Sequence, residues 1–318
     1  MDYYIRGLQD LDNNKTDEAI ADFTKAASLD PKLDEAYHKR GDILLEKGDL
    51  DGAAADYNRF LAHNRKDGMV FHNLGYIQLV KGNYDKAIAL FDEAIAIYGM
   101  SLSYLDRGYA KKAKGDIEGA ISDYNKAIEV NPKLAEGYFN RATVVEKGKA
   151  GAALADYGKA IEYKKEFAEA YFNRGALRQS KGDLKGAVDD YTKAIEINPQ
   201  DSNAFINRGL ARNELKDKGA VEDFDKAIEI NPRDAGAYLN RGVVRQENGD
   251  KRGAFADYEQ SIRLDPQLAL GYANRGIVLM EEGKYNEAIR DMEKAIALNE
   301  ELKTSLREYI DKMKKRRK

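Results

Sequence analysis

The sequence predicts an all-α fold, a solenoid of antiparallel helix pairs closed by a C-terminal capping helix. A short pattern, seen at residues 171–175 as Tyr-Phe-Asn-Arg-Gly, returns along almost the whole chain. Its period is nearly constant: Arg6 and Arg40 are 34 residues apart, and Arg141 and Arg174 are 33 apart. Such a period is typical of solenoids, which grow by stacking similar units. The arginine or its substitute stands at Arg6, Arg40, Leu74, Arg107, Arg141, Arg174, Arg208, Arg241 and Arg275.

The composition excludes several classes of function. The 318 residues carry a net charge of −3, so the chain offers no overall positive field for nucleic acid. The chain has no cysteine, which excludes disulfides, thiolate catalysis and cysteine-ligated metals. No apolar run approaches the roughly 20 residues that cross a bilayer. There is no phosphate-binding loop and no nucleophile–base motif, so we expect no catalytic residues and no cofactor.

The unit over residues 168–200 shows how each repeat forms two helices. Residues 168–181 are amphipathic, and Gly182 breaks this first helix before a polar residue that starts the next one. Residues 184–197 form the second helix, which ends before Pro199 because proline cannot continue a helix. Equivalent pairs are expected over residues 2–30, 34–64, 68–98, 101–131, 135–164, 168–198, 202–231, 235–265 and 269–299.

Small and aromatic residues predict how the two helices of a repeat pack. A glycine in mid-helix costs about 1 kcal/mol relative to alanine, so its recurrence indicates a packing role. An alanine follows 11 or 12 residues later, as Ala187 follows Gly175, and we expect the two to face each other. The aromatic residue before each glycine is expected in the core, because large rings dominate packing. These residues are Tyr3, Tyr37, Phe71, Tyr104, Tyr138, Tyr171, Phe205, Tyr238 and Tyr272.

The second half of the unit completes a family pattern, through Gly182, Ala187, Tyr191, Ala194 and Pro199. With the aromatic residue and glycine of the first half, the pattern resembles the tetratricopeptide repeat (TPR) family. The resemblance covers nine repeats within residues 1–300. It implies a right-handed superhelix with a concave groove lined by the first helices, and a role in binding peptides or proteins. The fold alone does not identify the ligand.

The C-terminal residues are expected to close the last repeat. Residues 301–313 read as one amphipathic capping helix that covers the apolar face of the ninth repeat. Its predicted apolar stripe is Leu302, Leu306, Tyr309 and Met313. Residues 314–318 form a basic tail, expected to be a solvated end; attraction of phosphates or anionic lipid is the alternative.

The repeated arginine is matched by an aspartate 15 or 16 residues later. The third repeat changes both positions together, to Leu74 and Leu90. This joint change predicts direct contact within one repeat, a structural ion pair between the two helices for which arginine and aspartate allow bidentate geometry. The predicted pairs are Arg6–Asp22, Arg40–Asp56, Arg107–Asp123, Arg141–Asp156, Arg174–Asp190, Arg208–Asp223, Arg241–Asp257 and Arg275–Asp291.

The third repeat also ends differently from its neighbours. Gly99-Met100 replaces the Asn-Pro ending, and the link to the fourth repeat is one residue shorter. One hypothesis is a hinge that divides repeats 1–3 from repeats 4–9. The alternative is a tolerated loop deletion.

The residue before the arginine is asparagine in most repeats, and this asparagine column is the first candidate binding site. In the TPR family this position faces the groove, and the column resembles that of the O-linked N-acetylglucosamine transferase repeat domain. Amides spaced one per repeat can bond the main chain of an extended peptide. The alternative is that each amide bonds a neighbouring helix. The column consists of Asn73, Asn140, Asn173, Asn207, Asn240 and Asn274.

An apolar stripe beside the column supplies further candidate contacts. Phe139 and Phe172 are the favoured ligand contacts, whereas Leu210, Val243 and Ile277 are expected to be buried between helices. The other members are Tyr76, Leu105, Tyr109, Ile206 and Leu239, of which Tyr109, Ile206 and Leu239 are assigned to the peptide site. Nearby acids predict a neutral-to-basic ligand; they are Glu136, Glu146, Glu169, Glu214, Glu247 and Glu281.

Two familiar binding modes are not expected. The clamp that some TPR proteins use for chaperone C-terminal carboxylates needs lysines at positions that are apolar or uncharged here. Those positions are Leu105, Tyr109, Phe139, Thr143, Phe172 and Ala176. His38 and His72 are equivalent residues but lack further ligands, so we expect no metal site.

The sequence therefore predicts a non-enzymatic scaffold that binds an extended peptide or protein in its groove, as a monomer or weak homo-oligomer. The alternatives are a targeting module of a larger enzyme or secretion machine, and a self-associating structural protein. The compartment stays open. A complete chain is expected in the cytoplasm, and a chain that has lost an N-terminal signal is expected outside it.

Overall fold

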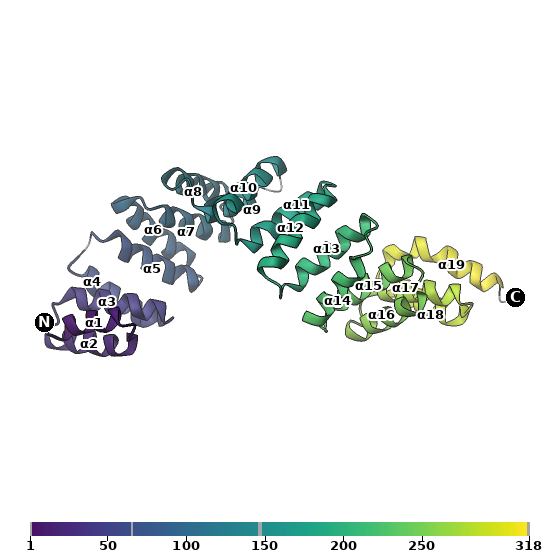
Figure 1. Cartoon of the computed structure of the whole chain (residues 1–318), viewed down its shortest axis with the longest axis horizontal. Helices are drawn as coiled ribbons and strands as arrows, with labels where there is room; N and C mark the ends of the chain where they lie inside the picture. Colours follow the sequence, from purple (N-terminus) through teal and green to yellow (C-terminus); the bar gives the residue numbers. More distant parts are fainter. Residues whose placement is uncertain (1, 65, 146–147, 317–318) are drawn as a thin grey trace. The chain divides into compact units, whose positions relative to one another are not determined.

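The computed structural model describes residues 2–64, 66–145 and 148–316, and within them the fold is helical throughout, without strands (Figure 1). Helices α1 to α18 form nine consecutive antiparallel pairs, as the sequence predicts. The first helix of each pair is α1 (Asp2–Asp12), α3 (Asp34–Glu46), α5 (Gly68–Val80), α7 (Ser101–Ala113), α9 (Ala135–Val145), α11 (Ala168–Ser180), α13 (Ser202–Glu214), α15 (Ala235–Glu247) and α17 (Ala269–Glu281). The second is α2 (Thr16–Leu29), α4 (Leu50–Leu61), α6 (Tyr84–Tyr98), α8 (Ile117–Val130), α10 (Ala150–Tyr163), α12 (Leu184–Ile197), α14 (Ala220–Ile230), α16 (Lys251–Leu264) and α18 (Tyr285–Leu298).

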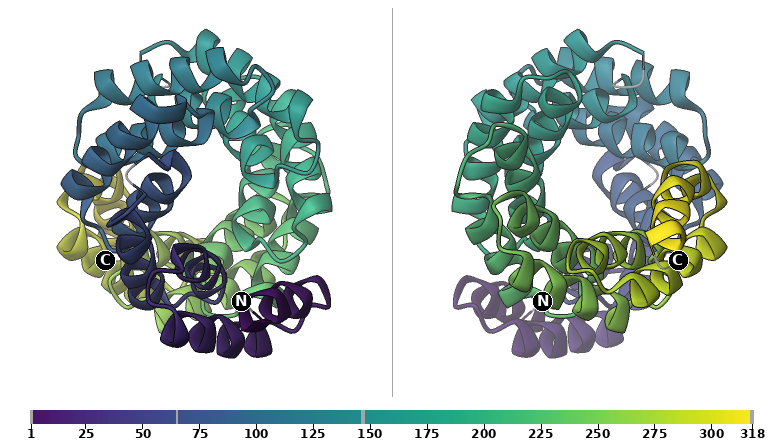
Figure 2. Two further views of the ribbon diagram at one scale, coloured as in Figure 1. Left: turned by 90° about the vertical axis from the view of Figure 1, so that its left-hand side faces the viewer. Right: turned by 90° about the vertical axis from the view of Figure 1, so that its right-hand side faces the viewer.

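The chain divides into two compact units, Met1–Tyr163 with α1 to α10 and Lys164–Lys318 with α11 onward. Within each unit the pairs stack side by side (Figure 2). In unit 2 the first helices pack in the series α11, α13, α15 and α17, and in unit 1 α5 packs on α7 and α7 on α9. The second helices of successive repeats approach each other less closely. The first helices therefore line the inner side of the curvature within each unit.

The mid-helix glycine faces a ring rather than an alanine in seven repeats, which corrects the prediction from sequence; Gly276 instead faces the Met292 side chain and the Ala288 backbone, and repeat 5 has Ala142 at this position. A Cβ atom on Gly175 would lie 3.0 Å from the Tyr191 ring, and one on Gly41 would lie 3.0 Å from the Tyr57 ring. The alanine lies one turn earlier on the second helix, where Ala187 is fully buried. The glycine thus makes room for a large buried ring, which stabilises the pair far more than contact between two small residues.

The predicted turn between the two helices is confirmed. Gly182 has a φ of +82°, a conformation that L side chains rarely adopt. The following Asp183 caps α12, because its carboxylate accepts a hydrogen bond of 3.0 Å from the Gly186 amide.

All eight predicted arginine–aspartate pairs form within their own repeat. In repeat 6, Arg174 Nε donates to Asp190 Oδ2 at 2.9 Å and Nη2 donates to Oδ1 at 2.6 Å. The other seven pairs have the same two-pronged geometry. In repeat 3, Leu74 and Leu90 instead join one apolar cluster. The joint replacement therefore substitutes hydrophobic packing for a buried ion pair.

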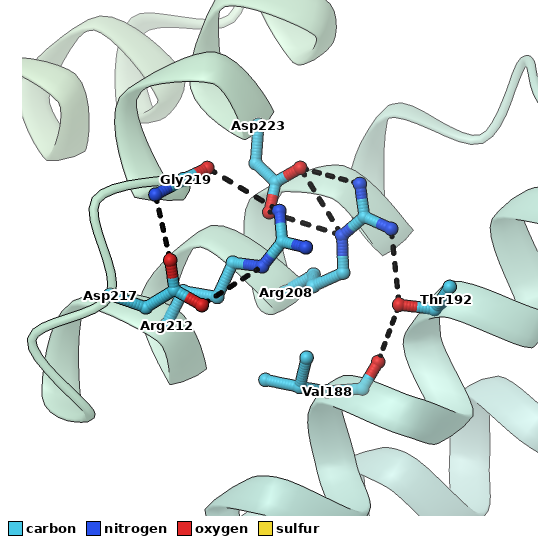
Figure 3. A network of polar contacts seen from close by, with 7 residues as sticks. All are labelled: Val188, Thr192, Arg208, Arg212, Asp217, Gly219 and Asp223. Atoms are coloured by element: carbon cyan, nitrogen blue, oxygen red, sulfur yellow. Dashed lines mark hydrogen bonds and ion pairs between the residues drawn. The ribbon is translucent and has the colours of Figure 1, made fainter.

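Figure 3 shows two contacts of these arginines that the sequence reasoning missed. Arg208 also donates from Nη1 to Thr192 Oγ1 of the preceding repeat, at 3.1 Å, so the arginine joins neighbouring repeats as well. A second arginine, Arg212, donates from Nη1 to Asp223 Oδ2 at 2.8 Å, an oxygen that also accepts from Arg208 Nε at 3.1 Å. Arg208 also contacts the aromatic residue three positions before it, since its guanidinium lies 5.5 Å from the Phe205 ring centre.

The structure does not support a hinge after repeat 3. Repeats 3 and 4 belong to the same compact unit, and α7 packs on both α5 and α6. Gly99 ends α6 in a left-handed conformation with a φ of +57°, so a glycine cap replaces the Asn-Pro ending. The shorter link is a compact helix ending.

The C-terminal helix closes unit 2, although its buried stripe differs from the predicted one. A short 3-10 turn η1 (Glu300–Leu302) leads into α19 (Lys303–Arg316). Leu306, Ile310 and Met313 are buried against the last repeat, whereas Tyr309 is 40% exposed. The helix also includes the first residues of the predicted basic tail, residues 314–316; residues 317 and 318 lie outside the described residues.

Candidate functional site

The asparagine column lies on first helices in both units. Unit 1 holds Asn73 on α5 and Asn140 on α9; unit 2 holds Asn173, Asn207, Asn240 and Asn274 on α11, α13, α15 and α17. All six side chains are half-buried. Because α11, α13, α15 and α17 are neighbours, unit 2 places one amide on each of four adjacent helices.

Most of these amides have hydrogen-bonding capacity to spare. Asn73 Nδ2 donates to the Tyr57 hydroxyl at 3.1 Å, which bears out the alternative of a structural amide at this position. Asn207 Nδ2 donates to the Asn203 carbonyl of its own helix at 3.0 Å. The remaining four amides make no hydrogen bond to the described residues. Each can therefore accept from one peptide group and donate to another.

The apolar stripe is less exposed than the sequence suggests. Phe139 and Phe172 are half-buried, their rings 5.9 Å and 5.6 Å from those of Tyr157 and Tyr191. Ile206 is half-buried against core clusters of unit 2. Leu239 is only 8% exposed and packs in the core. Its assignment to the peptide site is therefore corrected, because its side chain is buried by packing between helices.

The remaining stripe residues separate into two groups. Leu210, Val243 and Ile277 pack against core clusters, in line with their predicted burial, and Leu105 is 7% exposed. Tyr76 and Tyr109 are instead exposed, at 42% and 50%. The exposed rings of the stripe therefore belong to repeats 3 and 4.

A hollow on the first-helix side joins the column to the stripe in unit 2. It has a volume of about 420 Å³. Asn274 lies in its lining with Val243 and Ile277, and Tyr258 also contributes, its hydroxyl donating to Gln246 at 2.8 Å. The Asn274 side-chain amide thus lies beside two apolar side chains, while Glu247, Lys251 and Glu281 supply charges to the same lining. This arrangement suits a peptide backbone and a neighbouring side chain.

The acids that predicted a basic ligand are partly neutralised. Glu247 lies 3.3 Å from Lys216, and Glu281 lies 2.8 Å from Lys251. Glu214 accepts a hydrogen bond of 3.4 Å from Gln179, and Glu169 is exposed. Glu136 is half-buried, and Glu146 lies outside the described residues.

One acidic residue of the column escaped the sequence analysis. Asp106 on α7 stands 33 residues after Asn73 and 34 before Asn140, so it occupies the asparagine position of repeat 4. Its side chain is 24% exposed, and burial raises its pKa to about 6. The signal in the sequence is the repeat period itself, which marks Asp106 as the residue that replaces asparagine in repeat 4.

The described part of the chain contains no group of three residues suited to hold a metal ion, and His63 and His72 lie 3.0 Å and 3.7 Å from single aspartates. No helix within that part is both long and apolar enough to cross a membrane.

Comparison with models of protein families finds matches over most of the chain. Models described as tetratricopeptide repeat match residues 38–99, 168–201, 235–268 and 269–302. A model described as TPR repeat matches residues 7–48, 108–147, 143–182 and 216–249. The chain belongs to the tetratricopeptide repeat family. A protein-binding role is typical of this family.

Solved structures agree on the fold. The C-terminal part of a TPR repeat-containing protein from Cytophaga hutchinsonii is 17% identical, with a TM-score of 0.60, covering 72% of this chain and 95% of that one. A chain of the APC/C hetero-tetramer Cut9–Hcn1 is 16% identical, with a TM-score of 0.55, covering 85% and 55%. A tetratricopeptide repeat protein from Parabacteroides merdae is 19% identical, with a TM-score of 0.52, covering 77% and 98%. No curated protein matched the sequence.

Proposed function

We propose that this TPR protein is a non-enzymatic scaffold that binds an extended polypeptide along its first helices. The observation that carries the proposal is the amide series of unit 2. The side chains of Asn173, Asn240 and Asn274 make no hydrogen bond to a described residue, and the Asn207 side chain donates only to the Asn203 carbonyl of its own helix. A chain that merely needed polar residues at these positions would have no need for one amide per repeat.

The spacing of the helices suits an extended ligand. Packed helices lie about 8–10 Å apart, and an extended chain rises about 3.3 Å per residue. One amide per first helix therefore meets about every third residue of a bound strand. Each amide can donate to a main-chain carbonyl and accept from a main-chain N–H, so the contact is independent of the ligand's side chains.

Selectivity then comes from the side chains beside the column. In unit 2, Phe172 and the hollow around Asn274 favour apolar side chains of the ligand. Exposed acids such as Glu169 disfavour acidic ligands. The partner is accordingly a protein with an extended, partly apolar, neutral-to-basic segment.

Capture of the natural partner by the immobilised full chain tests this function. The Asn173→Ala plus Asn207→Ala variant is compared with the wild type and with a matched control, Asn58→Ala plus Asn286→Ala, whose exposed amides lie on second helices. Two lost amides remove up to four hydrogen bonds at about 1 kcal/mol each, so recovery should fall at least tenfold.

The control variant should recover the partner as the wild type does. Equal recovery of every captured protein by the column variant and the wild type would end the proposal.

A further inference from the structure

Repeats 3 and 4 of unit 1 expose an apolar surface on two neighbouring first helices. On α5, Met69, Tyr76 and Val80 are 45%, 42% and 55% exposed, at positions i, i+7 and i+11 of one helix face. On α7, Leu102 and Tyr109 are each 50% exposed, at positions i and i+7. Because α5 packs on α7, these side chains belong to one continuous region of the groove side.

A carboxylate without a cationic partner lies on the same face of α7. Asp106 follows Leu102 by four residues and precedes Tyr109 by three, which places all three on one side of the helix. No lysine or arginine in the described ranges pairs with Asp106. His72 Nε2 on α5 lies 3.7 Å away, and burial lowers the pKa of this histidine, so it is neutral at pH 7. The negative charge of Asp106 therefore stays uncompensated above its own pKa of about 6.

A buried hydroxyl of the same repeat makes no hydrogen bond to the described residues. The Tyr124 side chain on α8 is fully buried, and its hydroxyl bonds no group within the described chain. The equivalent hydroxyls of Tyr57 and Tyr191 donate to Asp42 at 2.9 Å and to Gln179 at 3.0 Å. Burial raises the pKa of Tyr124, and the neighbouring Tyr109, Asp123 and Asp106 raise it further.

We propose that Asp106, Tyr76 and Tyr109 form a subsite for an arginine or lysine side chain of the bound polypeptide. The subsite rests on the proposed function, since it would bind one side chain of a ligand that lies along the first helices. The carboxylate supplies a charge-assisted hydrogen bond, and the two exposed rings can stack on the cation. Met69 and Leu102 contact apolar residues on either side. The partner segment therefore carries a basic residue between apolar ones.

A peptide array probed with the labelled full chain tests the subsite. Each peptide has one variable central residue with an apolar residue on either side. The two flanking residues are varied over all pairs of Leu, Ile, Val, Met and Phe. The central residue is arginine, its uncharged analogue citrulline, or glutamate. The Asp106→Asn variant is the main comparison. This variant should fold, because other repeats carry asparagine at the same position. Glu118→Gln, which removes an exposed acid from α8, is the matched control.

The wild type and Glu118→Gln should bind arginine peptides at least tenfold better than citrulline peptides. Asp106→Asn should lose this preference while keeping its binding to citrulline peptides. Equal binding of arginine and citrulline peptides by the wild type would overturn the subsite and leave the groove function standing. A preference that survives in Asp106→Asn would also overturn it. Binding of no peptide of any kind would count against the subsite and the proposed function together.

Discussion

The first helices of unit 2 and the α5–α7 surface of unit 1 use one register in two different ways. In unit 2 the register carries asparagine four times in succession, and the neighbouring apolar side chains are half-buried or buried. On α5 and α7 of unit 1 the same register carries Asn73 and then Asp106, with exposed Tyr76 and Tyr109 nearby on the same two helices. A repeated amide suits a repeated main chain, whereas a single carboxylate among rings suits a single side chain. The difference teaches how one repeat can provide both general affinity and local selectivity.

The two units also differ in the charges around the buried aspartates. In unit 2, Asp223 accepts from Arg208 and from Arg212, and Asp190 and Asp257 likewise each accept from two arginines. In unit 1, most aspartates pair with one arginine; Asp123, which adds Lys111, is the exception. A carboxylate that neutralises two partly buried guanidiniums leaves more uncompensated charge when it is removed.

The largest expected effect is therefore the loss of a shared aspartate in unit 2. Asp223→Ala leaves Arg208 and Arg212, 12% and 23% exposed, without their carboxylate. We expect the free energy of unfolding to fall by about 3–5 kcal/mol, measured by urea denaturation and located at α13 and α14 by hydrogen exchange.

The matched variant in unit 1 is Asp22→Ala, which leaves one arginine. Arg6 is 58% exposed, so water can solvate it, and we expect a much smaller loss of stability than for Asp223→Ala, measured in the same urea denaturation. Equal losses in the two variants would contradict the account of shared aspartates.

A smaller effect of opposite sign is expected at Asp106. Burial raises its pKa from 3.8 to about 6, so between these values the folded chain binds more protons than the unfolded chain. Stability therefore falls as pH rises through this window, by up to about 3 kcal/mol at neutral pH. Asp106→Asn should raise the free energy of unfolding at pH 7 by up to that amount, and change it little at pH 4.

Denaturation of both proteins between pH 4 and pH 7 checks this expectation. Curves that run parallel across the range would show that the Asp106 carboxylate carries no folding cost, and hence that it is solvated rather than held for a ligand.

Periodicity was enough to predict the helices, their pairing and the arginine–aspartate contacts. The joint change to Leu74 and Leu90 even identified the partner within the repeat, because it removed both charges at once. Contacts that depend on how each helix is rotated about its own axis were harder to predict from the sequence. Gly175 faces the Tyr191 ring rather than Ala187, and Ile310 replaces Tyr309 in the buried stripe of α19, both shifts of a single turn or less.

The candidate site was predicted only in part, for a physical reason. The column follows from one repeated position, but the exposure of each side chain depends on how closely two repeats approach. Leu239 is lost to the core, while Tyr109, at a different position of the same helix face in repeat 4, stays exposed. Repeated residues show the shared architecture, and exceptions such as Asp106 have to be judged from their surroundings.

Photo-crosslinking to the natural partner tests most directly the claim that the ligand lies along the first helices. Benzoylphenylalanine is placed at Phe172 on α11 and Ile206 on α13, and for comparison at Lys193 on α12 and Lys226 on α14, which are exposed on second helices. The account predicts adducts with the partner from Phe172 and Ile206 and none from Lys193 and Lys226. Adducts formed from Lys193 and Lys226 and not from the two first-helix positions would contradict it, because the partner would then bind the face opposite the asparagine column.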